Sequence, residues 1–128
     1  MELKNATPLG KGSWHPAGSV VDDGLMTAVM SYRRRVAGVY RSVKPGEITS
    51  GVLGAPFHVS PKVDGELWFM VIEGGNATLV SVNGKAISGD IPVLAEVRAA
   101  AQKIKGRVVI PGEPVSYTHL TLPTTERV

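Results

Sequence analysis

Hydrophobic positions in two stretches of the chain recur at intervals of three and four residues, which is the spacing of an amphipathic helix. The first stretch, residues 24–43, follows Asp22 and Asp23, which can cap a helix and place acidic charge in its first turn. Pro45-Gly46 is predicted to end it. The second stretch, residues 92–104, starts with a proline suited to a first turn and is followed by Gly106. The apolar faces comprise Leu25, Met26, Val29, Met30, Tyr32, Val36, Val39, Tyr40 and Val43 in the first helix, and Val93, Leu94, Val97, Ala100, Ala101 and Ile104 in the second.

Short hydrophobic runs predict antiparallel strands. Gly74-Gly75-Asn76 separates two of these runs and is a strong hairpin signal, and Asn83-Gly84 predicts a second tight turn. Because side chains alternate along a strand, we expect Trp68 and Phe69 to face opposite sides of the sheet. Strands are predicted over 57–60, Leu67–Ile72, Ala77–Val82, Lys85–Ser88 and Arg107–Ile110.

The segment before the first helix is rich in glycine and proline. Residues 1–21 contain Pro8, Gly10, Gly12, Pro16 and Gly18 and are predicted to form an irregular lead-in. Taken together, the elements predict an α+β fold of antiparallel hairpins with two helices.

The composition suits one modest globular domain. The chain has 128 residues, 43% hydrophobic and 20% charged, with a net charge of +3, which is too short for two ordinary domains and too apolar for a disordered chain. The longest apolar run, Leu67–Ile72, has six residues, so we expect no segment to span a bilayer. Cysteine is absent, which excludes disulfides and thiolate zinc sites. With no apolar signal segment after Met1, we expect a cytoplasmic protein.

The last residues differ in character from the rest of the chain. Val115–Thr124 is rich in threonine and resembles the translation of a transposase-type sequencing adaptor read in one frame. We therefore expect residues 114–128 to be a non-native tail and residues 1–113 to be the N-terminal part of a longer protein. The alternative is a genuine threonine-rich tail.

One string carries candidate chemistry, Ser60-Pro61-Lys62-Val63-Asp64-Gly65-Glu66-Leu67. It lies between two predicted strands, so Lys62 would stand on a rigid turn. A lysine nucleophile must lose a proton from an ordinary pKa of about 10.4, and partial burial with neighbouring cations can lower that pKa. The alternative interpretation is a surface turn, since Asp-Gly is a favoured turn pair and lysine is common at the surface.

The Lys62-Val63-Asp64-Gly65 string resembles the nucleophile motif of the covalent nucleotidyltransferases, which include ATP-dependent DNA ligases, RNA ligases and capping enzymes. Val82-Asn83-Gly84 has the spacing and the glycine of that family's Arg-x-Gly motif but lacks the arginine, and Gly112-Glu113 resembles its Gly-Glu motif. The resemblance covers residues 30–113. Two positions depart from it, because Ser60 replaces a frequent acid and Leu67 replaces the arginine of many DNA ligases, as in some RNA ligases.

The resemblance implies that residues 1–113 are a partial nucleotidyltransferase (ATP-grasp-like) domain of an ATP-dependent polynucleotide ligase. DNA is the expected substrate, RNA is the alternative, and DNA repair is the expected process. Lys62 would take AMP from ATP and pass it to a 5′-phosphate end, which a 3′-hydroxyl then joins, with Mg²⁺ neutralising phosphate charge. Asp64 would orient the lysine turn, Gly65 would admit the nucleotide, and Glu113 would hold the ribose. No metal ligand is assigned, and the family's further phosphate-binding lysines would lie beyond residue 113, so the 128-residue chain is expected to be nearly inactive.

A second hypothesis is a non-catalytic α+β module that binds nucleic acid. Five cations, Arg33, Arg34, Arg35, Arg41 and Lys44, fall on or just after the first predicted helix. They could contact a phosphate backbone or form a solvated face opposite the apolar stripe. His15 and His58 have no ligand-like spacing, so we expect each to be a satisfied or surface histidine.

Overall fold

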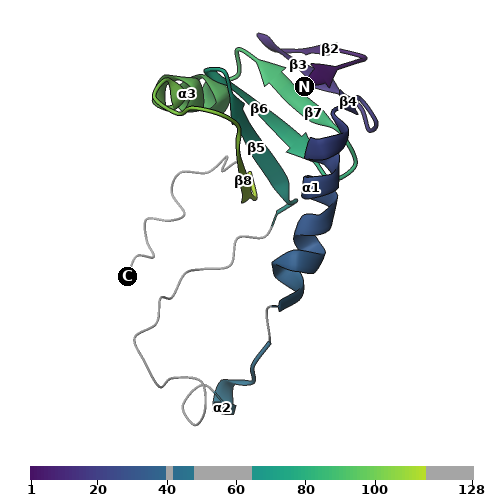
Figure 1. Ribbon diagram of the computed structural model, residues 1–128, viewed down its shortest axis with the longest axis vertical. Helices are drawn as coiled ribbons and strands as arrows, with labels where there is room; N and C mark the ends of the chain where they lie inside the picture. The colour runs from purple at the N-terminus through teal and green to yellow at the C-terminus, as the bar shows by residue number, and fades with distance from the viewer. Residues whose placement is uncertain (40–41, 48–64, 115–128) are drawn as a thin grey trace.

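The computed structural model describes residues 1–39, 42–47 and 65–114. Its centre is a six-stranded antiparallel sheet in the order β2-β3-β7-β6-β5-β8 (Figure 1). A separate two-stranded ladder pairs β1 (Glu2–Leu3) with β4 (Val20–Val21). The mixed α+β class with antiparallel strands is thus confirmed. The strands of the main sheet are β2 (Thr7–Leu9), β3 (Gly12–His15), β5 (Trp68–Glu73), β6 (Asn76–Ser81), β7 (Ala86–Gly89) and β8 (Val108–Gly112).

The central hairpin follows the sequence prediction to within one residue. Strands β5 and β6 pair from Trp68 opposite Ser81 to Glu73 opposite Asn76. Gly74 and Gly75 connect them with φ angles of 61° and 79°, a conformation that glycine adopts at little cost and that matches the twist of the two strands. Strands β7 and β8 also form close to their predicted positions. The predicted strand over 57–60 lies outside the described residues.

The helices agree with the prediction in part. Helix α3 (Pro92–Ala101) has its proline in the first turn. Helix α1 (Asp23–Arg35) begins as expected, because the Asp22 side chain accepts a hydrogen bond from the backbone N–H of Leu25. It ends at Arg35, however, so the predicted extent of 24–43 is wrong. A 3₁₀ turn, η1 (Ala37–Val39), follows, and Pro45-Gly46 belongs to a one-turn helix, α2 (Pro45–Glu47).

The early end of α1 has a physical reason. Leu25 and Val29 are buried against the sheet, whereas Met30 is 64% exposed and Val39 is 72% exposed. The last turn of α1 still contacts the sheet, because the Tyr32 ring meets that of Phe69 in β5. Figure 1 shows the chain after α1 leading away from the described part of the sheet. Without such packing, the β-branched and glycine residues at positions 36–39 favour leaving the helix.

Residues 1–21 form strands, so the prediction of an irregular lead-in is wrong. Gly10, with a φ of 59°, turns β2 back onto β3. Strand β3 then pairs with β7 from Gly12 opposite Gly89 to His15 opposite Ala86. The glycines and prolines mark the turns of this segment, while β3 is stabilised by a partner more than seventy positions away, which no local pattern could reveal.

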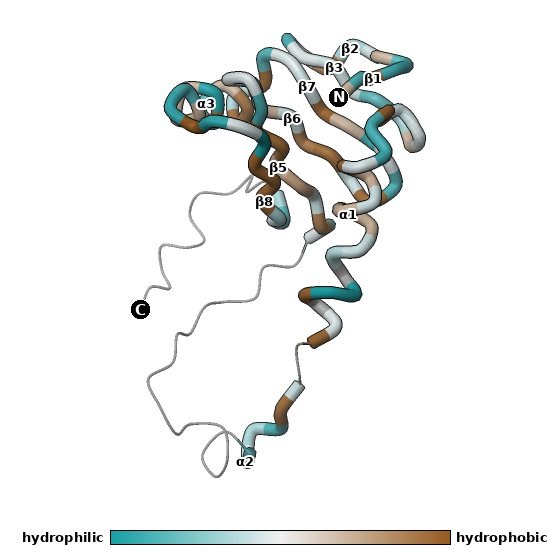
Figure 2. The backbone as a smooth tube through the Cα atoms, viewed as in Figure 1, coloured by the Kyte–Doolittle hydropathy of each residue, from teal (hydrophilic) through white to brown (hydrophobic). Residues whose placement is uncertain are grey.

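Two hydrophobic clusters cover opposite faces of the sheet. Phe69 belongs to the α1 cluster and its ring meets that of Tyr32 edge-on, with 5.4 Å between centroids. Trp68 packs instead in the α3 cluster, so the predicted alternation is confirmed. Figure 2 shows the hydrophobic residues concentrated along β5, β6 and β8. The α1 cluster contains Val20, Leu25, Val29, Phe69, Val71, Val80 and Ala86, and the α3 cluster contains Ala77, Leu79 and Leu94.

Candidate functional site

The sheet brings two of the predicted site residues to one end. Gly65 is exposed and lies just before β5, and Glu113 is exposed and lies just after β8. Strands β5 and β8 are antiparallel and place Trp68 opposite Gly112. The start of one strand therefore adjoins the end of the other, which sets Glu113 beside the residues that follow the Lys62 string. Lys62 and Asp64 lie outside the described residues.

The turn between β6 and β7 lies at the same end of the sheet. Trp68 also pairs with Ser81, the last residue of β6, so the turn at 82–85 is adjacent to the beginning of β5. Gly65, the Val82-Asn83-Gly84 string and the Gly112-Glu113 string thus lie at one end of the sheet. We call this end of the sheet the candidate site, and its described members are Gly65, Glu66, Trp68, Ser81, Val82, Asn83, Gly84, Lys85, Gly112 and Glu113.

Hydrogen bonds lock the 82–85 turn. The buried Ser81 hydroxyl accepts from the backbone N–H groups of Asn83 at 3.3 Å and Lys85 at 3.1 Å. The Ser81 backbone exchanges further bonds with the turn, because its N–H donates to the Lys85 carbonyl at 3.0 Å and its carbonyl accepts from Gly84 at 3.1 Å. Gly84 has a φ of 80°, in the region that favours glycine.

The N-terminal segment holds this turn from the outside. The backbone N–H of Gly18 donates to the Asn83 carbonyl at 2.9 Å, and those of Ser19 and Val20 donate to the Gly84 carbonyl at 3.1 and 3.2 Å. A Cβ added at Gly84 would lie 3.0 Å from the Gly18 nitrogen, so the two segments are in close contact. Sequence reasoning missed this role, since residues 18–20 lie in the segment predicted to be irregular.

Charged groups of both signs occupy the candidate site. The Lys85 ammonium nitrogen lies 3.9 Å from Oε1 of Glu66, with the two side chains 34% and 61% exposed. Glu113 adds a second carboxylate at this end. An exposed pair of this kind contributes little to global stability, so any importance of Lys85 and Glu66 must be local.

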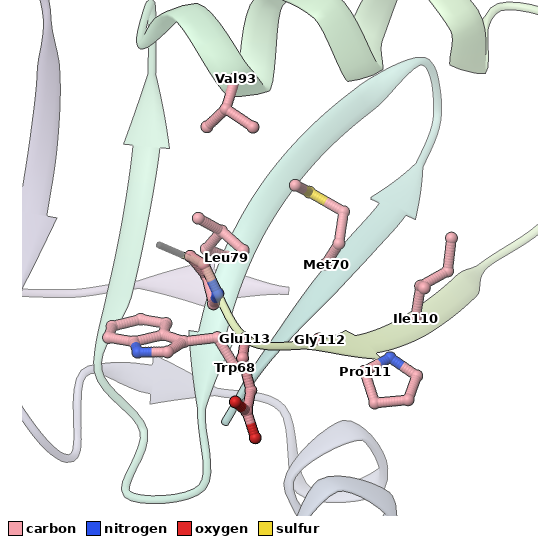
Figure 3. Close-up of a pocket in the computed structure, with 9 residues that line it drawn as sticks. Trp68, Met70, Leu79, Val93, Ile110, Pro111, Gly112 and Glu113 are labelled. Atoms are coloured by element: carbon pink, nitrogen blue, oxygen red, sulfur yellow. The ribbon is translucent and has the colours of Figure 1, made fainter. Parts of the chain in front are cut away.

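An apolar cavity of about 210 Å³ opens beside Glu113, between β5, β8 and α3. In Figure 3 the Trp68 indole and the Glu113 carboxylate lie at one end of it, and Val93 reaches toward it from α3. Its volume is below the roughly 300–1,000 Å³ of pockets that enclose whole ligands, so it suits a planar ring better than an entire nucleotide. The lining residues are Trp68, Met70, Leu79, Val93, Ile110, Pro111, Gly112, Glu113 and Pro114.

The predicted basic group is described only in part. Arg34 and Arg35 on α1 and Lys44 before α2 are exposed, and the Arg35 Nε donates to the Ser31 hydroxyl at 3.2 Å. Arg41 lies outside the described residues. Arg35 lines a cavity of about 150 Å³ together with Tyr32, Phe69, Val109 and Pro111, on the α1 face of the sheet and next to the candidate site.

His15 is buried and satisfied, as predicted. Its Nδ1 lies 2.7 Å from the Lys4 carbonyl and must donate to it, and its Nε2 lies 3.0 Å from the Ser88 hydroxyl. Both ring nitrogens are therefore used in holding β3, β7 and the chain before β2 together. His58 lies outside the described residues. No group of three metal-ligating side chains occurs within the part of the chain that the structure describes.

Comparison of the chain with models of protein families, with curated proteins and with solved structures returns no match. None of the helices in residues 1–39, 42–47 and 65–114 has the length and apolar character needed to span a bilayer.

Proposed function

We propose that this chain carries the nucleotide-binding part of an ATP-dependent polynucleotide ligase, with residues 1–113 belonging to its adenylation domain. The single observation that supports this most is the pairing of Trp68 with Gly112, since it brings the Gly-Glu string to the strand that follows the Lys62 string. A surface turn with a chance match to one motif gives no reason for a second motif of the same family to lie beside it.

In the proposed reaction the Lys62 amine attacks the α-phosphorus of ATP. A P–N bond forms, the bond to the bridging oxygen of the β-phosphate breaks, and pyrophosphate leaves as the lysine loses a proton. Mg²⁺ bound to the phosphates of ATP would lower the negative charge that the amine must approach. The AMP then passes to a 5′-phosphate end, and a 3′-hydroxyl displaces it to close the strand. We assign the reaction to nicked DNA in the cytoplasm, with RNA as the alternative polynucleotide.

The cavity and its carboxylate support the binding of ATP in this arrangement. The apolar lining around Trp68 and Met70 suits the face of an adenine ring, which is flat and weakly hydrated. Glu113 lies at the edge of the cavity (Figure 3) and offers two acceptor oxygens to ribose hydroxyls. Gly65 has no side chain to obstruct a nucleotide near the backbone.

The test is transfer of label from ATP carrying ³²P at the α-phosphate. The gene should first be sequenced from intact template across the codons for residues 110–128, and the protein should be expressed from the reading frame so established. We expect a labelled band after denaturing electrophoresis for the wild type and for K103A, which changes an exposed lysine outside the candidate site. We expect no band for K62A.

Two results would contradict the proposal. Absence of label in the folded wild type would exclude the ligase reaction, and full labelling of K62A would exclude Lys62 as the nucleophile. If the wild type bound nicked DNA but took up no label, the exposed Arg34, Arg35 and Lys44 would favour the alternative of a non-catalytic nucleic-acid-binding module.

A further inference from the structure

We propose that the ion pair between Glu66 and Lys85 is a positioning device that fixes the start of β5 against the 82–85 turn. This inference rests on the proposed function, because its purpose is to set the direction in which the chain leaves the sheet toward Lys62. The family resemblance assigns no role to either residue. Their Oε1 and Nζ atoms lie 3.9 Å apart at the candidate site.

Hydrogen bonds hold the backbone at Lys85 in place. Its N–H donates to the Ser81 hydroxyl, and its carbonyl accepts from the Ser81 N–H. The preceding residue, Gly84, is held through its carbonyl by Ser19 and Val20. Lys85 is also the less exposed partner, at 34%. An ion pair formed from a fixed backbone loses less conformational entropy than one between two mobile segments, so Lys85 can act as the anchor.

Glu66 is the partner that needs an anchor. Trp68 is the first residue of β5 and is held by pairing on both sides, with Ser81 and with Gly112. Leu67 is partly buried against the α1 cluster. Glu66 precedes Leu67 and is 61% exposed. Among its described contacts, the ion pair with Lys85 is the interaction that connects Glu66 to the sheet.

Position along the chain explains why an exposed pair can matter. A mobile Glu66 would let Gly65 adopt many directions, and reaction at a lysine amine depends on a narrow range of approach to phosphorus. An exposed ion pair is worth about 0.2–1 kcal/mol, which corresponds to a change of up to about fivefold in the reaction rate. Reversing one charge replaces attraction by repulsion, and we expect that change to lower the rate about tenfold.

The experiment is a charge exchange read out by single-turnover adenylation. E66K and K85E should each lower the rate of label transfer at saturating ATP about tenfold, with little change in the ATP concentration for half-maximal rate. The double variant E66K/K85E should return the rate to within about twofold of the wild type, and K85R should retain it. Hydrogen exchange at the amides of residues 65–68 should rise in each single variant and fall again in the double variant.

The matched control is the ion pair of Asp90 with Arg98, whose atoms lie 3.3 Å apart beyond the other end of β7. The single variant R98E should leave the adenylation rate unchanged. Labelling of the wild type with no recovery in E66K/K85E would overturn the inference while leaving the proposed function intact. K85E could instead raise the ATP concentration for half-maximal rate, and this rise could persist in the double variant. That result would overturn the inference, because it would indicate that Lys85 contacts phosphate directly. Absence of label in the wild type would overturn both.

Discussion

Arg107 and Asp22 are joined by a hydrogen bond of 2.6 Å between Nη2 and Oδ2. The same guanidinium binds Glu73 through two bonds of 3.0 Å, from Nε and from Nη2. Asp22 also caps α1, since its Oδ1 accepts from the backbone N–H of Leu25 at 3.0 Å. Arg107, which precedes β8, thus connects that strand with the N-cap of α1 and with the end of β5. This network lies at the opposite end of the sheet from the candidate site.

Removing the Asp22 side chain should destabilise the fold through two separable contributions. We expect D22A to lower the free energy of unfolding by about 1–2 kcal/mol, because it removes both the helix cap and the ion pair. D22N retains an effective cap and loses only the charge, so it should cost less than about 1 kcal/mol. Urea unfolding followed by circular dichroism measures both values. Equal losses in D22A and D22N would contradict the capping role.

The same network predicts how stability depends on pH. Hydrogen bonds from Arg107 hold the pKa of Asp22 and the pKa of Glu73 below their ordinary values, and the N–H of Leu25 lowers that of Asp22 further. Folding is therefore favoured with both groups ionised. This stabilisation is complete above the ordinary carboxyl pKa of about 4 and is lost as the pH falls through the lower folded values.

R107Q should reveal that contribution. At pH 7 we expect the variant to be less stable than the wild type, and at pH 3 or below we expect the difference to shrink because the carboxylates take up protons. Urea unfolding at pH 7, 5 and 3 provides the measurement. K103Q is the control, because it removes an exposed cation that is not part of this network. Its free energy of unfolding should differ little from that of the wild type, and the difference should be the same at each pH. A loss in R107Q that is independent of pH would contradict the assignment.

Much of the architecture could be predicted because it is encoded locally. Gly74 and Gly75 specify the turn between β5 and β6, and Asp22 and Pro92 mark the starts of both longer helices. The alternation of Trp68 and Phe69 between the two faces follows from strand geometry alone. These features depend on a few neighbouring residues, so the sequence pattern was sufficient.

The features that were missed depend on distant partners. The pairing of Trp14 with Ile87 turns a glycine-rich segment into part of the sheet. Val39, just after the end of α1, is 72% exposed in the part of the chain that the structure describes, so the apolar pattern continues beyond the helix without such burial. At the candidate site, the sequence suggested Gly65 and Glu113 but gave no signal for Lys85. Its relation to Glu66 arises because the turn between β6 and β7 lies beside the start of β5, where Ser81 pairs with Trp68.

Gly84 should be intolerant of substitution. Its φ of 80° costs an L-residue about 1–2 kcal/mol, and an added Cβ would lie 3.0 Å from the Gly18 nitrogen. We expect G84A to lower the free energy of unfolding by at least about 1 kcal/mol. G24A is the control, because Gly24 lies in α1 with its nearest atom 3.8 Å from the added carbon, and alanine there should stabilise the helix by up to about 1 kcal/mol.

These two variants also test the contact between the N-terminal segment and the 82–85 turn. If the contact holds the turn, hydrogen exchange at the amides of Gly18, Ser19 and Val20 should increase in G84A, because their acceptors on the turn are displaced. The amides of α3 should be unaffected. Unchanged exchange at residues 18–20 would show that the turn is held by its own bonds to Ser81.

Glu113 offers the sharpest test of how the nucleotide is held. If its carboxylate accepts a hydrogen bond from a ribose hydroxyl, E113A should lower the adenylation rate constant over KM by about 10- to 100-fold, since a hydrogen bond to a charged group is worth about 1.5–3 kcal/mol. Removing the partner hydroxyl from ATP, as 2′-deoxy or 3′-deoxy ATP, should cause a loss of similar size in the wild type.

The two losses must not add if they report the same bond. In E113A, the deoxy analogue whose missing hydroxyl bonds the carboxylate should react as well as ATP does, while the other analogue should show its wild-type ratio. E96Q, which changes an exposed carboxylate on α3, should retain the full preference for ATP. Additive losses for both analogues in E113A would mean that Glu113 acts on the site without touching the sugar, and the cavity beside Trp68 would then have to hold the base in an orientation that turns the ribose away from β8.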